Sequence, residues 1–204
     1  MAVELIVVMQ HITVCIQHRH QFSGRPEEKL LMIDHPDVVV IYSSDLIRAK
    51  DTAKPTAEKL GLKINLDKRF REIDAGEWDF MPFLDWIKNY PDEFKKWGDD
   101  KYNARCVGGE TIIELKDRIV GAIEELVELH ENQIIMIFAH ANPIQVFSAY
   151  ATGDFKENIN KIGDPPNVST TKVEYNDGKF NLIEYGKADY LGDIITKLPT
   201  ADEL

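Results

Sequence analysis

The chain has 204 residues, of which 44% are hydrophobic and 29% charged, and its formal net charge is −11. A chain of this length can bury a full hydrophobic core, so we expect a single domain over residues 1–204. No apolar run reaches the roughly 18 residues of a membrane span, and Glu4 interrupts the first run too early for a signal peptide. The acidic balance argues against nucleic acid, because binding to phosphate backbones depends on lysine and arginine. We therefore expect a cytoplasmic protein with no membrane and no nucleic-acid partner.

Two apolar runs that each lead to a histidine indicate where a site could form. Val3–Val8 is followed by Gln10 and His11, and Ile134–Ala139 is followed directly by His140. Short runs rich in Val and Ile are typical of buried strands in a parallel sheet. Because ligands bind beyond the carboxyl ends of such strands, we expect both histidines to lie around one anion, such as a phosphoryl group. The alternative for each histidine is a hydrogen-bonded strand end with no role in chemistry.

A third strand is predicted over Asp37–Ser44, and a helix over Leu46–Leu60 follows it. Residues that favour the ends or the interruption of a helix are Ser44 and Asp45 as N-caps, Pro55 as a bend or break, and Gly61 as a stop. Arg48 falls in the first turn, where unpaired amides and the positive end of the dipole attract anions. It therefore fits an anion-binding corner, with a solvated surface arginine as the alternative.

The middle of the chain combines two carboxylates with an aromatic segment. Glu72 and Asp74 lie in a predicted loop that follows a short edge strand over Lys63–Leu66. Either carboxyl could supply a proton, and plain surface charge is the alternative. Phe80–Trp97 is predicted to be helical, because its aromatic residues recur at three- and four-residue steps. With the polar loop after it, this segment is expected to form a helical insert, at about residues 79–107, that covers the site.

The longest predicted helix covers Ile112–Glu131 and follows Gly108–Thr111. Thr111 and Glu114 have the spacing of a capping box, in which each side chain bonds a free backbone amide of the other residue. The paired glycines before them permit a close backbone approach. This helix returns the chain to the strand that ends at His140.

Ala141 and Asn142 follow His140 and lead into a predicted helix over Ile144–Thr152. The amino end of this helix should direct backbone amides at the same region. Near the end of the sequence, an Asn-Asp-Gly turn at 176–178 separates Thr170–Tyr175 from Lys179–Tyr185, which predicts a hairpin.

Metal chemistry is a competing interpretation of the N-terminal region. His18 and His20 have a known metal-ligand spacing, and a strand-end histidine could supply a third ligand. No acidic ligand follows nearby, so we favour a cationic loop beside an anion site. Cys15 and Cys106 are far apart, which indicates neither a zinc site nor a disulfide framework. We expect no metal and no cofactor.

Five segments in this order resemble the histidine phosphatase superfamily, which has the phosphoglycerate mutase-like fold. They are Ile41–Ala53, Phe70–Trp78, Gly108–Thr111, Phe138–Ile144 and Asn167–Thr171, and the resemblance extends from about Leu5 to about Tyr185. It implies a three-layer α/β/α architecture, with helices on both faces of a mostly parallel sheet and a small helical cover insert. It also implies a phosphomonoester hydrolase acting on a small phosphorylated metabolite.

The resemblance also assigns roles to individual residues. His11 matches the histidine that becomes phosphorylated, Arg48 a phosphate-binding arginine, Glu72 the proton donor to the leaving oxygen, and His140 the second histidine of the phosphate pocket. Gln10, Ala141 and Asn142 are expected to line the phosphate-binding site beside them. The scheme requires a phosphohistidine intermediate and a small phosphate ester.

The chain departs from the family pattern beside the expected nucleophile. Gln10 stands where the family has arginine, and Ile12 where it has glycine. A hydrogen bond to a charged group is worth roughly 1.5–3 kcal/mol, so we expect reduced activity. Two other functions stay open: a catalytically impaired phosphate-binding or interaction protein that retains the fold and, less favoured, a phosphoglycerate mutase. A homodimer is compatible with these features.

Overall fold

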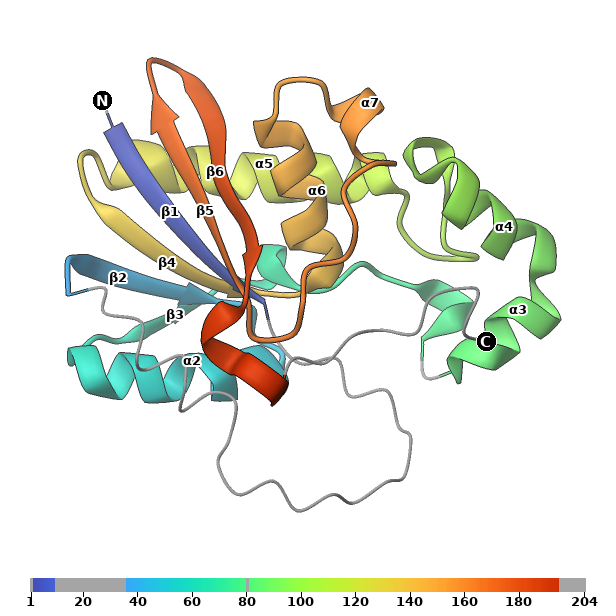
Figure 1. Ribbon diagram of the computed structural model, residues 1–204, viewed down its shortest axis with the longest axis horizontal. Helices are drawn as coiled ribbons and strands as arrows, with labels where there is room; N and C mark the ends of the chain where they lie inside the picture. Colours follow the sequence, from blue (N-terminus) through green and yellow to red (C-terminus); the bar gives the residue numbers. More distant parts are fainter. Residues whose placement is uncertain (1, 10–35, 80, 195–204) are drawn as a thin grey trace.

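The computed structural model describes residues 2–9, 36–79 and 81–194, and a six-stranded sheet lies at its centre (Figure 1). The strand order is β3-β2-β4-β1-β5-β6, with β3, β2, β4 and β1 parallel and with β5 and β6 antiparallel to their neighbours. The bounds are β1 Ala2–Met9, β2 Val38–Ser43, β3 Ile64–Leu66, β4 Ile134–Ala139, β5 Thr170–Asn176 and β6 Lys179–Lys187. The predicted mostly parallel sheet is confirmed.

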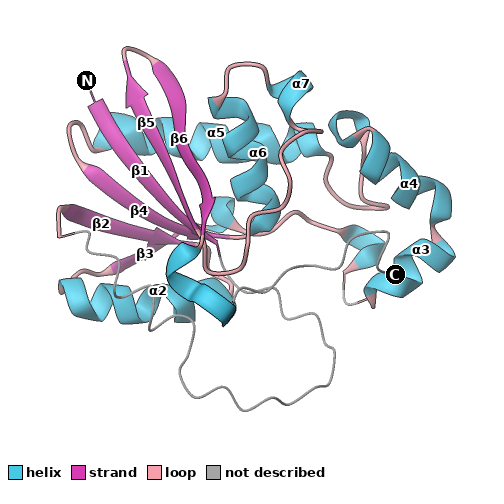
Figure 2. Cartoon of the chain, in the orientation of Figure 1, coloured by secondary structure: helices cyan, strands magenta, loops and turns pink. Residues whose placement is uncertain are grey.

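Helices cover both faces of this sheet (Figure 2). Along β4, Ile135 and Ile137 belong to a hydrophobic core shared with α5 (Ile112–Leu129) and α6 (Ala141–Ala151). Met136 and Phe138, which point to the opposite face, belong to a second core that includes residues of α2 (Ile47–Leu60). Because successive side chains of a strand alternate between faces, burial on both sides accounts for a run with no polar alternation.

The amino end of α2 differs from the prediction. Leu46 occupies the N-cap position and makes no side-chain hydrogen bond there, so neither Ser44 nor Asp45 is the cap. Asp45 instead accepts two hydrogen bonds of 2.6 Å from the Arg71 guanidinium, and the Ser44 hydroxyl takes part in the site described below. At Asp45 the distant partner outweighs the local capping preference, whereas the Ser44 hydroxyl also accepts the Leu46 N–H at 3.3 Å.

Of the two other predictions for α2, the break at Pro55 is wrong and the stop at Gly61 is confirmed. The helix is continuous over residues 47–60 and contains Pro55, so the division predicted there does not occur. Gly61 ends the helix as predicted: its φ is 67°, in the left-handed region, and its N–H points back to the carbonyls of Ala57 and Glu58.

The single helix predicted over Phe80–Trp97 is two helices, α3 (Phe83–Asn89) and α4 (Pro91–Asp99). Tyr90 separates them with a φ of −134°, and Pro91 takes the first position of α4. A proline has no N–H and would clash with the preceding turn if one helix continued, whereas it fits well at a helix start. α3 and α4 lie beside the sheet rather than over it (Figure 1).

The aromatic residues of this segment pack around one buried indole. The rings of Trp86, Tyr90 and Trp97 lie 5.2, 6.2 and 6.1 Å from that of Trp78, centroid to centroid. Trp78 is buried and follows the loop that carries Glu72. The aromatic residues of α3 and α4 thus pack against the edge of the main hydrophobic core at Trp78 and hold these helices beside the loop.

The second half of the chain follows the predicted elements closely. The capping box of α5 is present, with Thr111 and Glu114 bonding each other's backbone amides. The hairpin is also confirmed, because Asp177 and Gly178 have φ values of 52° and 78°, as a two-residue turn of this kind requires. α6 begins at Ala141 rather than at Ile144, and a short helix, α7 (Phe155–Asn158), follows it without having been predicted.

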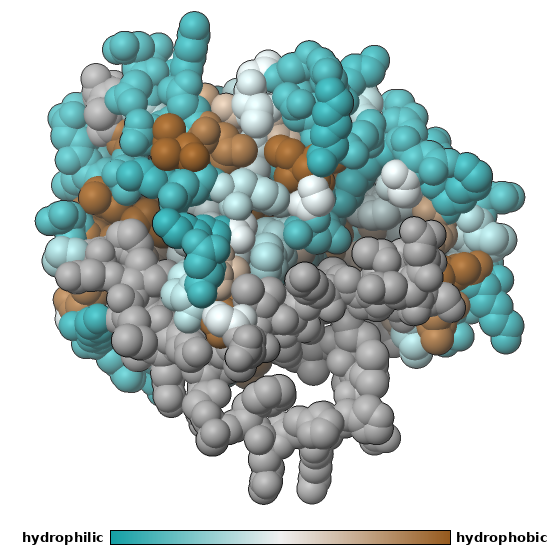
Figure 3. Space-filling model, viewed as in Figure 1, coloured by the Kyte–Doolittle hydropathy of each residue, from teal (hydrophilic) through white to brown (hydrophobic). Residues whose placement is uncertain are grey.

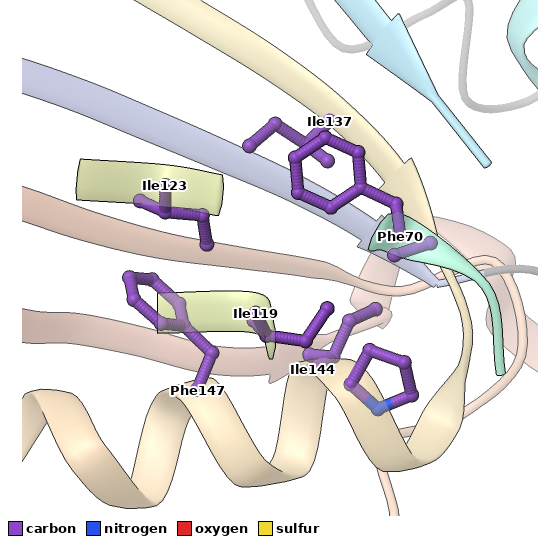
Figure 4. Close-up of a pocket in the computed structure, with 8 residues that line it drawn as sticks. Phe70, Ile119, Ile123, Ile137, Ile144 and Phe147 are labelled. Carbon is purple, nitrogen blue, oxygen red and sulfur yellow. The ribbon is translucent and has the colours of Figure 1, made fainter. Parts of the chain in front are cut away.

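The surface of the described residues is mainly hydrophilic in the view of Figure 3, with small separate hydrophobic patches. Within the same residues, every helix is too short or too polar to cross a membrane. A small apolar space lies between α5, β4 and α6 (Figure 4). It is lined by Phe70, Ile119, Ile123, Ile137, Ala139, Pro143, Ile144 and Phe147.

The packing around this space predicts the effect of a truncation. Phe147 is 2% exposed and lines the space, so Phe147→Ala enlarges it and should lower the free energy of unfolding by about 3–5 kcal/mol. Urea denaturation measures the loss. Leu129→Ala is the control, since Leu129 is 69% exposed and its truncation should change the free energy by no more than about 0.5 kcal/mol. Equal losses in the two variants would contradict the packing described here.

Candidate functional site

Three side chains meet where β2 and β4 end. His140 follows β4, Ser44 follows β2, and Arg48 lies in the first turn of α2. The Arg48 Nε–H donates to His140 Nδ1 at 3.3 Å, and His140 Nε2 lies 2.9 Å from Ser44 Oγ. Because a guanidinium can only donate, Nδ1 must be an unprotonated acceptor, and the proton of the neutral ring is on Nε2. The His140 Nε2–H therefore donates to Ser44 Oγ.

His140 is held in its neutral form. It is 1% exposed, and burial lowers its pKa to about 3, helped by the positive charges of Arg48 and Arg118. An imidazole of this kind stays neutral over the whole physiological pH range.

Glu72 reaches the same corner from the loop after β3. Its Oε1 accepts the Ile73 N–H at 2.9 Å, and the side chain and main chain of Asn142 also bond to the carboxyl. Burial raises the pKa of Glu72, while these hydrogen bonds and the charge of Arg48 oppose the rise. The net upward direction favours a carboxyl that still carries a proton, as a general acid requires.

Asp74, the other carboxylate of this loop, is exposed and has a local role. Its Oδ1 accepts the Gly76 N–H at 3.0 Å, which is the bond of a turn. Asp79, further along, was not predicted as a site residue. Burial raises its pKa, and the nearby charge of Arg48 opposes this, so a second carboxyl lies within electrostatic range of the arginine.

Two loops dock backbone against backbone beside Glu72. A Cβ on Gly76 would lie 2.2 Å from the Val107 carbonyl oxygen, and a Cβ on Gly109 would lie 2.1 Å from the Asp74 carbonyl oxygen. Both distances are far below any real carbon–oxygen contact, so only glycine fits at either position. The close approach predicted for the paired glycines is confirmed at Gly109.

A largely buried lysine joins the segment after α4 to α6. Lys101 Nζ bonds Gln145 Oε1, lies 3.8 Å from Asp164 Oδ1 and lies 5.3 Å from the centre of the Trp97 ring. Burial lowers its pKa, and the charges of Asp164 and Glu72 oppose this. Gln145 is one helical turn from Asn142, so this ammonium group connects the segment of α3 and α4 to the helix that carries Asn142.

The structure thus brings together Arg48, Glu72, His140, Ala141 and Asn142 from the set selected in the sequence. The other selected residues, Gln10, His11, Ile12, Cys15, His18 and His20, lie outside the described residues. Among the described residues, no three His, Cys, Asp or Glu side chains are grouped in a way that could hold a metal ion. The sequence reasoning missed Ser44 as a histidine partner, since its signal, a serine directly after a strand, equally suggests an N-cap.

Solved structures define the fold class of the chain. A Bacillus stearothermophilus protein, YhfR, superposes with a TM-score of 0.82 at 20% identity, covering 93% of this chain and 99% of that one. A mycobacterial glucosyl-3-phosphoglycerate phosphatase complex superposes with a TM-score of 0.79 at 22% identity, covering 91% and 99%. The chain therefore has the α/β fold of the phosphoglycerate mutase-like proteins.

Sequence comparisons then define the family. The model of the histidine phosphatase superfamily (branch 1) matches residues 30–188, so the chain belongs to this superfamily. Phosphoserine phosphatase 1 of Hydrogenobacter thermophilus is 32% identical over 124 residues, which are 60% of this chain and 59% of that protein. Glucosyl-3-phosphoglycerate phosphatase of Mycolicibacterium vanbaalenii is 30% identical over 142 residues, 66% of this chain and 63% of that protein. The match thus spans about three fifths of each relative.

The lowered pKa of His140 predicts a pH dependence of stability. In the unfolded chain a histidine has a pKa near 6.5, whereas the folded value is about 3, so the unfolded state binds more protons between these values. The contribution of His140 to stability is therefore lost as the pH falls below about 6.5. In His140→Asn, the decline of the unfolding free energy with falling pH should be shallower by up to about 1.4 kcal/mol per pH unit. Denaturant titrations from pH 7 to pH 4 measure both slopes, and identical slopes would refute the buried neutral imidazole.

Proposed function

We propose that the protein is a phosphomonoesterase that hydrolyses a small phosphorylated metabolite through a phosphohistidine at His11. The observation that carries this proposal is the convergence of Arg48, His140 and the Glu72 carboxyl at the carboxyl ends of β2 and β4. A guanidinium, a neutral imidazole and a carboxyl with a raised pKa are what the phosphoryl group and its leaving oxygen need.

The sheet register supports His11 as the nucleophile. β1 is parallel to β4, and its last residue, Met9, pairs with Ala139. Neighbouring strands of a sheet lie about 4.8 Å apart, so Met9 ends β1 beside the end of β4. We therefore propose that His11, two residues later in the sequence, reaches an anion bound at Arg48.

The reaction then has two balanced steps. A ring nitrogen of His11 forms a bond to phosphorus as the bond from phosphorus to the ester oxygen breaks, and the Glu72 carboxyl gives its proton to that oxygen. In the second step the Glu72 carboxylate takes a proton from water, whose oxygen attacks phosphorus and releases His11 and inorganic phosphate. Arg48 and the amides at the start of α6 hold the phosphoryl oxygens in both steps, and His140 orients the Arg48 guanidinium by accepting its Nε–H.

The segment 79–107 is proposed to cover this site as a helical insert within one domain of residues 1–204. Two contacts support this proposal. α3 and α4 pack on Trp78, a few residues after Glu72, and Lys101 bonds Gln145 of α6. An insert fastened at these two points borders the loop and the helix that hold the general acid. The names of the two relatives, both phosphatases of phosphorylated small molecules, agree with a substrate of this size.

A reduced rate is proposed from the residues beside the nucleophile. Gln10 and Ile12 replace an arginine and a glycine of the superfamily pattern, so one phosphate contact with a formal charge is lost. The second candidate function, a phosphate-binding or interaction protein without turnover, rests on the same two replacements.

Hydrolysis of p-nitrophenyl phosphate tests the proposed nucleophile. Wild type should release nitrophenol, and His11→Ala should fall to the uncatalysed background. The matched control is His130→Gln, because His130 precedes β4 whereas His140 follows it, and its ring bonds Tyr42 and Gln133 rather than any site residue. This variant should keep the wild-type rate. Equal rates in wild type and His11→Ala would reject the assignment.

Trapping of the phosphohistidine distinguishes the two candidate functions, an enzyme and a phosphate-binding protein without turnover. Incubation with a ³²P-labelled ester followed by rapid denaturation should leave acid-labile, base-stable phosphate on His11. A protein that binds phosphate, as measured by calorimetry, but never acquires this label would support the second candidate.

A further inference from the structure

Arg118, on the second turn of α5, is hydrogen-bonded to the backbone that carries Glu72. Its Nη1 donates to the carbonyl oxygens of Arg69 at 2.7 Å and Arg71 at 3.1 Å, and its Nη2 lies 3.4 Å from that of Glu72. One guanidinium therefore contacts three carbonyls within four consecutive residues. The position of the Glu72 backbone relative to α5 is set by these bonds.

The same guanidinium forms a bidentate pair with Glu110. Arg118 Nε lies 2.8 Å from Glu110 Oε1 and Arg118 Nη2 lies 2.7 Å from Oε2. Both side chains are only 21% exposed, so solvent screens the pair far less than a surface ion pair. Glu110 in turn accepts the Asp74 N–H at 2.9 Å and donates its own N–H to the Asp74 carbonyl at 2.8 Å.

The backbone is thus hydrogen-bonded to α5 or to the loop before it on both sides of Glu72 in the sequence. Arg118 bonds the residues up to Glu72, Glu110 bonds Asp74 two residues later, and the Gly76 and Gly109 contacts close the same junction. At its other end, the Glu72 carboxyl meets Asn142 of α6. Glu72, the proposed proton donor, is therefore held between two helices. Its backbone is bonded to Arg118 of α5, and its carboxyl is bonded to Asn142 of α6.

We propose that Arg118 and Glu110 are positioning residues that aim the Glu72 carboxyl at the leaving oxygen of the substrate. This inference rests on the proposed function. A general acid works only within about 2.6–3.2 Å of the oxygen that it protonates, and a displacement of about 1 Å can cost about a hundredfold in rate. Loss of the pair should therefore damage proton donation more than phosphate binding.

The dependence of the rate on the leaving group isolates this role. Nitrophenolate leaves as a stabilised anion and needs little help from an acid, whereas an alkyl alcohol must be protonated as it leaves. In Arg118→Met and Glu110→Gln, kcat for an alkyl phosphomonoester such as phosphoserine should fall at least about tenfold more than kcat for p-nitrophenyl phosphate, with KM nearly unchanged. Arg118→Lys keeps the charge but not the fork, and should recover only part of the loss.

The control is Arg69→Met, which removes a guanidinium from the same loop together with its pairs to Asp67 and Glu125. It leaves the Arg118 bonds in place and should lower both rates by the same factor. If Arg118→Met and Glu110→Gln also lower both rates by one common factor, the pair serves stability alone and the inference is overturned. Glu110→Gln conserves shape and keeps the test available if Arg118→Met does not fold.

A double-mutant cycle completes the test. If the pair acts through Glu72, then adding Glu110→Gln to Glu72→Gln should not lower the alkyl-ester rate further. Additive losses would contradict the inference while leaving the phosphatase proposal intact. A wild type that hydrolyses neither ester would overturn the proposed function, and this inference with it.

Discussion

The position of β4 between β2 and β1 is the constraint on which the rest of the structure depends. Its backbone is hydrogen-bonded along both edges, and its side chains are buried on both faces. An unpaired backbone group would be costly in such surroundings, so a shift in register is strongly opposed. Ser43 of β2 pairs with Phe138 and Met9 of β1 pairs with Ala139, so the three strands end at nearly the same level. The residues that follow β2 and β4 therefore emerge together.

The site depends on two side chains, His140 and Glu72, whose protonation states are set by burial. His140 is kept neutral because it is buried near two guanidinium groups, and the Glu72 pKa is raised because desolvation outweighs its hydrogen bonds. Both groups feel the charge of Arg48, and their pKa values shift in opposite directions, which keeps the imidazole neutral and favours a protonated carboxyl. These opposite shifts require no unusual side chain, only different depths and partners.

Much of the fold could be predicted from local patterns in the sequence. The two apolar runs, the capping box at Thr111 and the turn at Asp177 each carry their signal within a few residues, and all appear as expected. One error arises from a distant partner, because Asp45 pairs with Arg71 instead of capping α2. Another is local, because Pro91 starts a new helix where the aromatic spacing predicted a continuous one.

The site was predictable in part for the same reason. Arg48 could be selected because the first turn of a helix is visible in sequence, and its contact with His140 follows from the strand order. Arg118 could not be selected, because its partners are backbone carbonyls 46–49 residues earlier, which no side-chain pattern records. Ser44 was noticed but given the wrong partner, since nothing local shows that an imidazole from 96 residues later lies beside it.

The opposed glycines at the junction beside Glu72 have an evolutionary consequence. What a methyl group at Gly76 or Gly109 would strike is a main-chain carbonyl, an atom that every amino acid possesses. No exchange of the residue opposite can therefore make room, and the usual route of compensation by a smaller neighbour is closed. Either site can drift only if the whole junction is rebuilt, so these two positions should tolerate fewer replacements in descendants of this chain than most of its hydrophobic interior.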